Sequence, residues 1–392
     1  MTTALIQAVE AHREEMAALS EQLVTLPTEN PPGRCYLEAV HLLQGHLRRL
    51  RLGDTRVVGD CVLSFTGDGP RTLYFSGHYD VVPAQSPSQF QTARRGVNIF
   101  GRGTADMKGG LAAMIYAAKA LLDAKLLGNG RIGLVFVPDE ETAGPRGSRY
   151  LSEMAILGDN GIGMLTPEPT GGVIWNANRG AISLRVTIKG KSAHVGRQRE
   201  GVNAFEQMLR VAQALNMVKR EVEQRATAYT ISPDSARHSI LMLGGQCGSG
   251  SNFNVVPETC WFTVDRRINP EEDLQAEKHR LLSVFDEMRA EGINLELEVL
   301  QEAGAAGVSG KDPLGQALAR NVKRITGKAP DFEMCPGLLE IRFYAERGIP
   351  AFAYGPGLLS VAHGPNEFVS LDRIVQCAQI YAMTAAEFLA GA

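Results

Sequence analysis

The chain has 392 residues, of which 44% are hydrophobic, so it is long enough for two domains and a large buried core. Its formal net charge is −3, which leaves no basic surplus to attract nucleic acid or an anionic membrane. No stretch approaches the ~18 apolar residues of a membrane span. The N-terminus also lacks the apolar run of a signal peptide, so we expect a cytoplasmic protein.

The first part of the chain alternates between helices and strands. A helix is predicted over residues 3–24, and an amphipathic helix is predicted over residues 36–50. Two short β-rich runs that end at Gly or Pro, "CVLSFTG" and "TLYFSGHYDVV", are predicted strands.

A buried helix and a central strand follow. "ADMKGGLAAMIYAAKALLDAK" is apolar nearly all round, as a buried helix is, and "GRIGLVFVPDEE" is typical of a strand covered on both faces. The order strand, helix, strand predicts an α/β crossover unit. In such sheets ligands gather at the carboxyl ends of the strands.

The middle of the chain, residues 180–302, shows a different order of elements, β-α-β-β-α-β. This order predicts a small two-layer α+β domain with an open antiparallel sheet. Residues 303–392 return to a helix, a strand and a long closing helix, which we assign to the first domain. The expected domains are therefore 1–179 with 303–392, and the insert 180–302.

The six cysteines are scattered along the chain and form no CxxC pair. We therefore expect buried thiols in a reducing compartment, and neither a zinc knot nor a set of disulfides.

Several side chains suited to metal binding follow strand ends or lie in tight loops. His78 and Asp80 stand two apart after a strand, and a carboxylate beside a histidine can fix its tautomer for metal ligation. Asp106 opens the buried helix, where capping is the ordinary role of an aspartate. Glu168 lies between two prolines, and His363 lies in a Gly/Pro loop. Each residue alone is a weak signal.

Three consecutive acids, Asp139, Glu140 and Glu141, follow the central strand. A solvated turn is the usual explanation for such a run. Two histidines and several acids in one α/β frame, however, suit a pair of divalent ions ~3.5–4 Å apart that share one carboxylate. Histidine and carboxylate groups favour zinc, and manganese or cobalt can use the same ligands.

Six motifs, in order along nearly the whole chain, resemble those of the M20 metallopeptidase and deacylase family. They are "SGHYDVVP", "GRGTADMKGG", "PDEETAG", "TPEPTG", "KSAHVGRQREGVNA" and "AHGPNEF". That family includes acetylornithine deacetylase, succinyl-diaminopimelate desuccinylase, aminoacylase-1 and the glutamate carboxypeptidases. The resemblance implies an α/β/α catalytic domain of the metallopeptidase type with an inserted lid or dimerisation domain. It also implies a homodimer formed through that lid.

The resemblance implies two divalent metal ions per chain. Asp106 would bridge them, with His78 and Glu168 completing one site and Glu141 and His363 completing the other. It further implies that the peptide bond after the bridging aspartate is cis.

The resemblance also assigns the catalytic groups. Glu140 would be the general base that takes a proton from the attacking water and passes it to the leaving amine. Asp80 would orient His78, and we expect Asp139 to be only a solvated neighbour. His194 matches a lid histidine that stabilises the oxyanion, either in its own subunit or in the partner.

Three polar residues are predicted to bind substrate by their match to the family. Asn254 and Arg267 are assigned to substrate binding, with Arg267 suited to an α-carboxylate through bidentate pairing. The motif is short, so Arg266 is the alternative to Arg267. Arg342 is the third substrate-binding prediction.

The sequence departs from the family pattern near Arg342. Many relatives have Gly-Thr or Gly-Ser and then Asp before this arginine, whereas this chain has Leu338, Leu339 and Glu340. Arg197 and Arg199 likewise replace proline and neutral residues. These changes disfavour acetylornithine and succinyl-diaminopimelate as substrates and leave room for a less polar acyl group.

The predicted function is hydrolysis of the amide bond of an N-acyl amino acid or short peptide, without nucleic-acid or membrane partners. The alternatives within the class are a dipeptidase and a glutamate-type carboxypeptidase. Outside this class, the alternatives are a non-catalytic metal-binding protein and another hydrolysis, such as an aromatic deamination, on the same metal pair.

Overall fold

The structure is a computed structural model that describes residues 2–391. The described chain forms two compact units. The first takes in the residues up to Asn176, then Gly307–Glu333, and the residues from Leu339 onward. The second consists of Ala177–Ala306 and Met334–Leu338, so the predicted insert 180–302 lies inside it.

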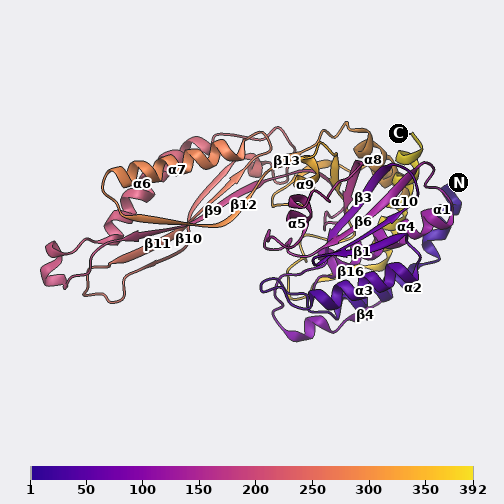
Figure 1. The fold of residues 1–392 in the computed structure, drawn as a ribbon, viewed down its shortest axis with the longest axis horizontal. Helices are drawn as coiled ribbons and strands as arrows, with labels where there is room; N and C mark the ends of the chain where they lie inside the picture. The colour runs from indigo at the N-terminus through magenta and orange to yellow at the C-terminus, as the bar shows by residue number, and fades with distance from the viewer. Residues whose placement is uncertain (1, 392) are drawn as a thin grey trace. The chain divides into compact units, whose positions relative to one another are not determined.

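The first unit is built on a large mixed sheet (Figure 1). Its strands, in order across the sheet, are β1 (Asp54–Val58), β2 (Cys61–Thr66), β6 (Gly130–Val137), β3 (Arg71–His78), β7 (Gly161–Thr166), β15 (Ala351–Ala353), β8 (Ile174–Asn178) and β13 (Ala306–Gly307), with β14 (Phe332–Cys335) paired to β8. Strands β6, β3, β7 and β15 run parallel, and β2 is antiparallel to β6. The chain passes between the units within or beside β8, β13 and β14.

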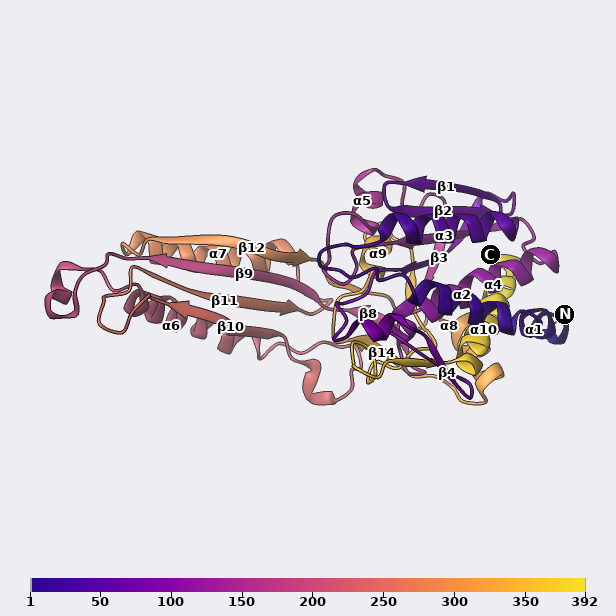
Figure 2. The ribbon, with the colours of Figure 1, turned by 90° about the horizontal axis from the view of Figure 1, so that it is seen from below.

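Helices cover both faces of this sheet. Neighbouring residues on a strand point to opposite faces, and on β3 Tyr74 packs on Tyr344 whereas Phe75 packs on Tyr381. Helix α9 (Ile341–Ala345) therefore lies on one face, and α10 (Leu371–Gly391) lies on the other. Helix α10 packs beside α4 (Gly109–Asp123) and α8 (Pro313–Thr326) (Figure 1, Figure 2).

The remaining elements of the first unit surround this core. They are α1 (Thr2–Glu10), α2 (Arg13–Val24), α3 (Tyr36–Arg49), α5 (Ser148–Glu153), and a small sheet of β4 (Ala93–Arg95), β5 (Asn98–Phe100) and β16 (Phe368–Ser370). The predicted helix over 3–24 was therefore wrong in one respect, because α1 and α2 are separate. Helix α2 starts after His12, whose ring lies against Tyr116 with centroids 5.2 Å apart.

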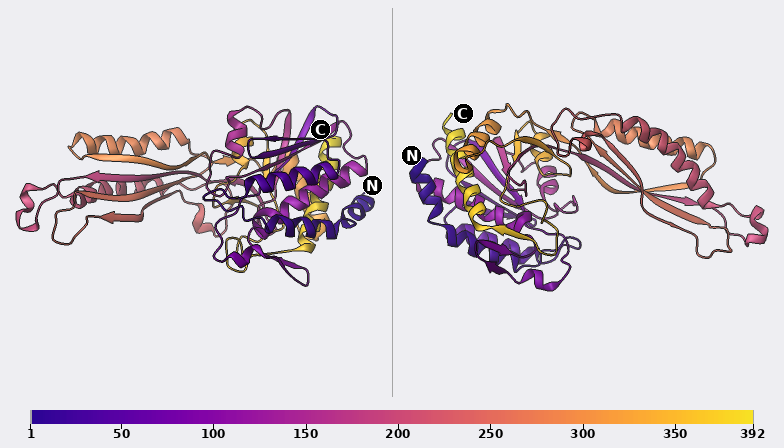
Figure 3. Two further views of the ribbon diagram at one scale, coloured as in Figure 1. Left: turned by 60° about the horizontal axis from the view of Figure 1, so that its bottom comes forward. Right: turned by 180° about the vertical axis from the view of Figure 1, so that it is seen from behind.

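The second unit has the predicted order β-α-β-β-α-β. Its elements are β9 (Gly180–Lys189), α6 (Ala204–Val222), β10 (Ile240–Ser249), β11 (Thr259–Ile268), α7 (Leu274–Ala290) and β12 (Leu295–Ala303). The strands form an antiparallel sheet in the order β10-β11-β9-β12, and the two helices cover one face of it (Figure 1, Figure 3). Burial alternates along β11, as expected of a sheet with one open face. The predicted fold class is confirmed in both units.

Cys35, Cys61, Cys247, Cys260 and Cys377 are free thiols, as expected. Cys61, Cys260, Cys335 and Cys377 are buried, but Cys35 is only half-buried and Cys247 is exposed, so the prediction of buried thiols was wrong for these two. Within residues 2–391, the helices are too short or too polar to cross a bilayer.

Candidate metal centre

The register of the sheet places the predicted ligands at one edge. His78, the last residue of β3, pairs with Val137, the last residue of β6. The acidic turn that follows Val137 therefore begins beside His78, at the carboxyl ends of both strands. Asp106 comes from a short π-helical turn, Thr104–Lys108, that leads into α4. The Asp106–Met107 peptide bond is cis, as predicted.

The five predicted ligands lie together as two trios that share Asp106. His78, Asp106 and Glu168 form one, and Asp106, Glu141 and His363 form the other, with the ligand atoms of each trio within 4.8 Å of one another. Asp106 Oδ1 is 3.2 Å from His78 Nε2, and Asp106 Oδ2 is 3.2 Å from His363 Nε2. The two carboxylate oxygens thus face different histidines, which is the geometry that a bridging ligand needs.

The buried acids of the cluster favour the binding of cations. Burial raises the pKa of Glu168 well above its usual range, and its buried Oε1 has no hydrogen-bond partner among the described residues. Burial also opposes ionisation of Asp106, but hydrogen bonds from His363 and His78 outweigh it and hold its pKa low. Hydrogen bonds to Asp106 and Glu141 raise the pKa of His363 to about 10. Divalent ions would offset these charges in place of protons, so the donor set fits a metal pair.

Glu140 lies beside this cluster without belonging to either trio. Its Oε2 is 3.9 Å from His78 Nε2, and its side chain is 13% exposed. Burial raises the pKa of Glu140 to about 8, helped by the charge of Glu141 and opposed by that of His78. A carboxyl group with a pKa near neutrality is suited to giving and taking protons.

Asp80 holds both His78 and the acidic turn. His78 Nδ1 is 3.0 Å from the backbone oxygen of Asp80 and 3.4 Å from its Oδ1, which leaves Nε2 free for a metal. The Asp80 carboxylate also accepts the backbone N–H groups of Glu140 (3.3 Å) and Glu141 (3.2 Å). It therefore fixes the direction of both glutamates, a role that the sequence did not predict.

Asp139 is not the solvated neighbour that the sequence predicted. It is buried, and its backbone adopts the left-handed conformation with φ 67°. Its Oδ1 accepts a hydrogen bond from the Tyr36 hydroxyl at 3.0 Å, and its Oδ2 accepts one from the Arg146 N–H at 3.1 Å. The prediction was wrong because the turn closes on itself and points this carboxylate inward, where it caps backbone and side-chain donors.

A second buried acid, Glu367, holds the bridging aspartate. Its Oε1 accepts the backbone N–H groups of Ala105 (3.0 Å) and Asp106 (3.2 Å), and its Oε2 pairs with Arg102 at 2.7 Å. Arg102 also donates to the backbone oxygen of His363 at 3.1 Å. No role was predicted for Glu367, although it lies within the quoted motif "AHGPNEF".

Two of the remaining predicted residues lie together in the second unit. His194 is exposed, and its Nδ1 accepts the Gly196 N–H at 3.1 Å, so the neutral ring carries its proton on Nε2. The next residue, Val195, donates its N–H to the backbone oxygen of Asn254 at 3.0 Å. The unit therefore presents a neutral imidazole N–H beside the Asn254 loop.

The three arginines have different surroundings. Arg266 is fully buried and forms ion pairs with Glu272 and Glu277. Arg267 pairs with Asp265, and its side chain is 28% exposed. Of these two alternatives, only Arg267 is open to a ligand.

Arg342 is buried in the first unit. Its Nη1 donates to the backbone oxygen of Leu339 at 2.7 Å, and its Nη2 lies 3.5 Å from Glu340. Burial raises the pKa of Glu340 to about 7, and the charge of Glu340 in turn raises the pKa of Glu140. Glu340 is thus electrostatically coupled to the centre.

An α/β/α unit with two sites that share one aspartate, and with a free glutamate beside them, is typical of metal-dependent hydrolases of amide bonds. Residues 74–387 match the model of the family described as peptidase family M20/M25/M40, and the chain belongs to that family. The resemblance seen in the motifs is confirmed, and the chain is a metal-dependent amidohydrolase.

Known relatives cover nearly all of the chain. A probable succinyl-diaminopimelate desuccinylase from Staphylococcus epidermidis is 25% identical over 339 residues, which is 80% of this chain and 83% of the relative. An M20 family metallo-carboxypeptidase from Sulfolobus solfataricus has the same fold, with TM-score 0.79, 18% identity, and coverage of 96% of this chain and 99% of that chain. The YXEP protein of Bacillus subtilis, a dinuclear metal binding peptidase from the M20 family, has TM-score 0.69, 16% identity, and coverage of 97% and 99%.

We predict that Glu367→Ala lowers the free energy of unfolding by about 3–5 kcal/mol, because it leaves the buried guanidinium of Arg102 without its opposite charge. Glu367→Gln should lower the free energy of unfolding by less, since its amide oxygen still accepts the two backbone N–H groups. Denaturant unfolding measures both changes. Glu346 is exposed and forms no ion pair among the described residues, so the same substitutions there provide the control. Equal stabilities for Glu367→Ala and wild type would contradict the assigned role.

Proposed function

We propose that this protein is a deacylase that hydrolyses the amide bond of an N-acyl amino acid at two divalent metal ions, with Glu140 as general base. The observation that supports it best is the position of Asp106 between two histidines, with Glu140 close by but in neither trio. A protein that only binds metal has no use for this additional carboxyl group.

His78, Asp106 and Glu168 would hold one ion, and Asp106, Glu141 and His363 would hold the other. Zinc suits the mixed nitrogen and oxygen ligands, and manganese or cobalt is the alternative. Bound there, the ions would supply an acidified water and a polarised substrate carbonyl.

The chain's own groups would move the proton. Glu140 would accept it from the attacking water and deliver it to the leaving amine, as a general base does. Asp80 would keep this geometry, because it binds the backbone N–H groups of Glu140 and Glu141 as well as the ring of His78.

His194 would donate a hydrogen bond to the oxygen on which negative charge develops. Its Nε2–H is a neutral donor and is free of protein partners among the described residues, whereas Nδ1 is already bound by Gly196. The donor would come from the same subunit or from a partner.

Different residues would contact the α-carboxylate and the acyl group of the substrate. Arg267 would pair with an α-carboxylate, and Asn254 would hydrogen-bond to the substrate. Arg342 would act by positioning the Leu339 segment, to which it donates a hydrogen bond. Phe253, whose side chain is 98% exposed beside Asn254, supports an apolar acyl group.

A carboxypeptidase or dipeptidase is the second candidate. The similar fold of a metallo-carboxypeptidase over 96% of this chain favours it, since an α-carboxylate at Arg267 would serve both reactions. A screen of the metal-loaded protein against N-acetyl, N-succinyl and longer N-acyl amino acids and against dipeptides separates the candidates. The proposal fails if dipeptides are cleaved and no N-acyl amino acid is.

We predict different outcomes for the two neighbouring glutamates. Glu140→Ala should keep both metal ions and lower kcat by about 10²–10⁴, the usual contribution of a general base. Glu141→Ala should lose metal at one site. Metal analysis and steady-state kinetics on the two variants measure this, and each variant serves as the other's control. A Glu140→Ala enzyme within about tenfold of wild type would exclude Glu140 as the base.

We predict that His194→Ala lowers kcat by about 10²–10³, the value of one oxyanion donor, without changing metal content. Gln198→Ala alters the same exposed turn without removing the imidazole and is the matched control. A normal kcat for His194→Ala would remove this residue from the mechanism.

We also propose a homodimer through the second unit. Strand β10 is an edge strand, and it exposes Ile240 (39%) and Met242 (47%). Helix α6, which contacts β10, exposes Phe205 (42%) and Leu209 (50%) one turn apart. An exposed apolar set along an unpaired edge is typical of an interface between chains.

The dimer proposal predicts that wild type sediments at twice the mass of one chain. The double variant Leu209→Glu and Met242→Glu should sediment as a monomer, because it places charges on the proposed contact. Leu37, 62% exposed on α3 in the first unit, gives the control Leu37→Glu, which should remain a dimer. A monomeric wild type would exclude the dimer.

A further inference from the structure

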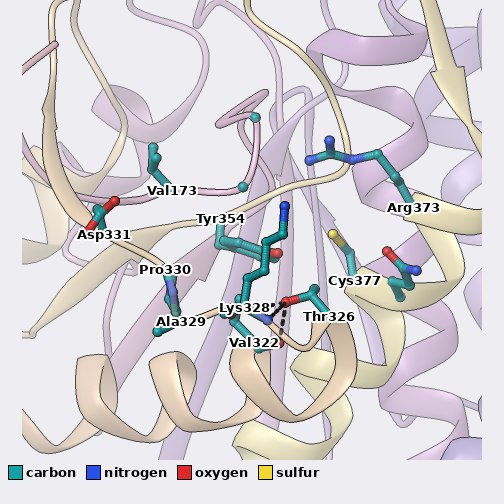
Figure 4. A pocket seen from close by; sticks show the side chains of 13 residues that line it. Val173, Val322, Thr326, Lys328, Ala329, Pro330, Asp331, Tyr354, Arg373 and Cys377 are labelled. Carbon is teal, nitrogen blue, oxygen red and sulfur yellow. Dashed lines mark hydrogen bonds between the residues drawn. The ribbon is translucent and has the colours of Figure 1, made fainter.

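A cavity of about 410 Å³, called the second cavity to distinguish it from the metal centre, lies in the first unit (Figure 4). Its walls come from the turn after the Glu168 loop, the end of α8, the residue after β15 and the first turns of α10. None of the five ligands lines it. The proposed reaction therefore gives this cavity no role.

Two cations reach into the cavity without partners. Figure 4 shows the Lys328 amino group and the Arg373 guanidinium extending into the space between α8 and α10, whereas Asp331 lies on the other side, beside Val173. Across residues 2–391, the side chains of Lys328 and Arg373 make no hydrogen bond or ion pair. Burial raises the pKa of the nearby Cys377 thiol to about 12, and the charge of Arg373 partly offsets this.

The Tyr354 hydroxyl is a third group without a partner. Tyr354 is only 3% exposed, yet its hydroxyl forms no hydrogen bond with the described residues. The surrounding protein does not fully enclose this oxygen, which therefore opens on the cavity. A buried tyrosine hydroxyl normally finds a partner, and here the partner has to come from within the cavity.

Helix polarity explains one cation but not the other. Lys328 follows the carboxyl end of α8, where a cation is favourable without any ligand. Arg373, however, lies in the first turn of α10, where the helix dipole disfavours a positive charge. An anion held between the two side chains would account for Arg373 and would meet the amino end of α10.

We infer that this cavity binds a small anion with at least two charged oxygens, such as a phosphate or a dicarboxylate. Lys328 and Arg373 pair with its oxygens, and the Tyr354 hydroxyl donates a hydrogen bond to it. Val173, Val322 and Thr326 contribute to the rest of the lining, and Asp331 lies at its far side.

Crystals of the metal-loaded protein soaked in selenate test the location directly. The inference expects an anomalous selenium peak between Lys328, Arg373 and Tyr354. A peak at the metal centre alone, or no peak, overturns it.

Calorimetric titration of the metal-loaded protein tests affinity and identifies the ligand class, with phosphate and succinate as separate probes. The double variant Lys328→Gln and Arg373→Gln should bind the preferred probe at least about tenfold more weakly, the order expected for lost charged hydrogen bonds. Tyr354→Phe should weaken binding without removing charge. Lys323→Gln removes a cation from the last turn of α8 outside the cavity and should change nothing.

Anions that bind at the metal centre should also bind there in the double variant. Only the heat of binding that the double variant loses relative to wild type therefore reports binding in the cavity. If the double variant unfolds, Tyr354→Phe and the selenate peak still decide. Identical titrations for wild type, Tyr354→Phe and a folded double variant overturn the inference, as does binding seen only at the concentrations of the crystal soak.

Discussion

One buried carboxylate, that of Asp106, has to face two histidines that are far apart in the chain. His78 comes from the end of β3 and His363 from a loop before α10, and each lies 3.2 Å from a different oxygen of Asp106. Glu367 holds the backbone on the Asp106 side, and Arg102 joins Glu367 to the carbonyl of His363. The position of the Asp106 side chain thus depends on the buried ion pair of Arg102 and Glu367, which are not among the predicted ligands.

The buried acids of the centre fall into two kinds. Asp80, Asp139 and Glu367 accept backbone N–H groups, so their charges are satisfied by the fold and they hold loops in place. Glu168 has an oxygen without any such donor, and burial raises its pKa. Glu168 thus differs from these three acids, because one of its buried oxygens has no donor among the described residues.

The same distinction explains what the sequence could predict. The meeting of His78 and Glu141 at one edge of the sheet was predictable, because both follow apolar strand patterns and parallel strands end at the same edge. The role of Asp139 was not, because it depends on a left-handed turn and on Tyr36, which lies 103 residues earlier. Similarly, the alternating pattern predicted the β-α-β-β-α-β insert, whereas short strands such as β7 and β8 depend on long-range pairing that local sequence does not encode.

The metal centre and the second cavity share a wall made of backbone. Gly355 follows Tyr354, and a Cβ atom at Gly355 would lie 2.1 Å from the Pro167 oxygen, so no side chain fits between the two segments. The Gly355 N–H also donates to Thr170 Oγ1 at 3.3 Å, just beyond Glu168 in the chain. With no side chain between them, the backbone after Tyr354 packs directly on the backbone that carries Glu168.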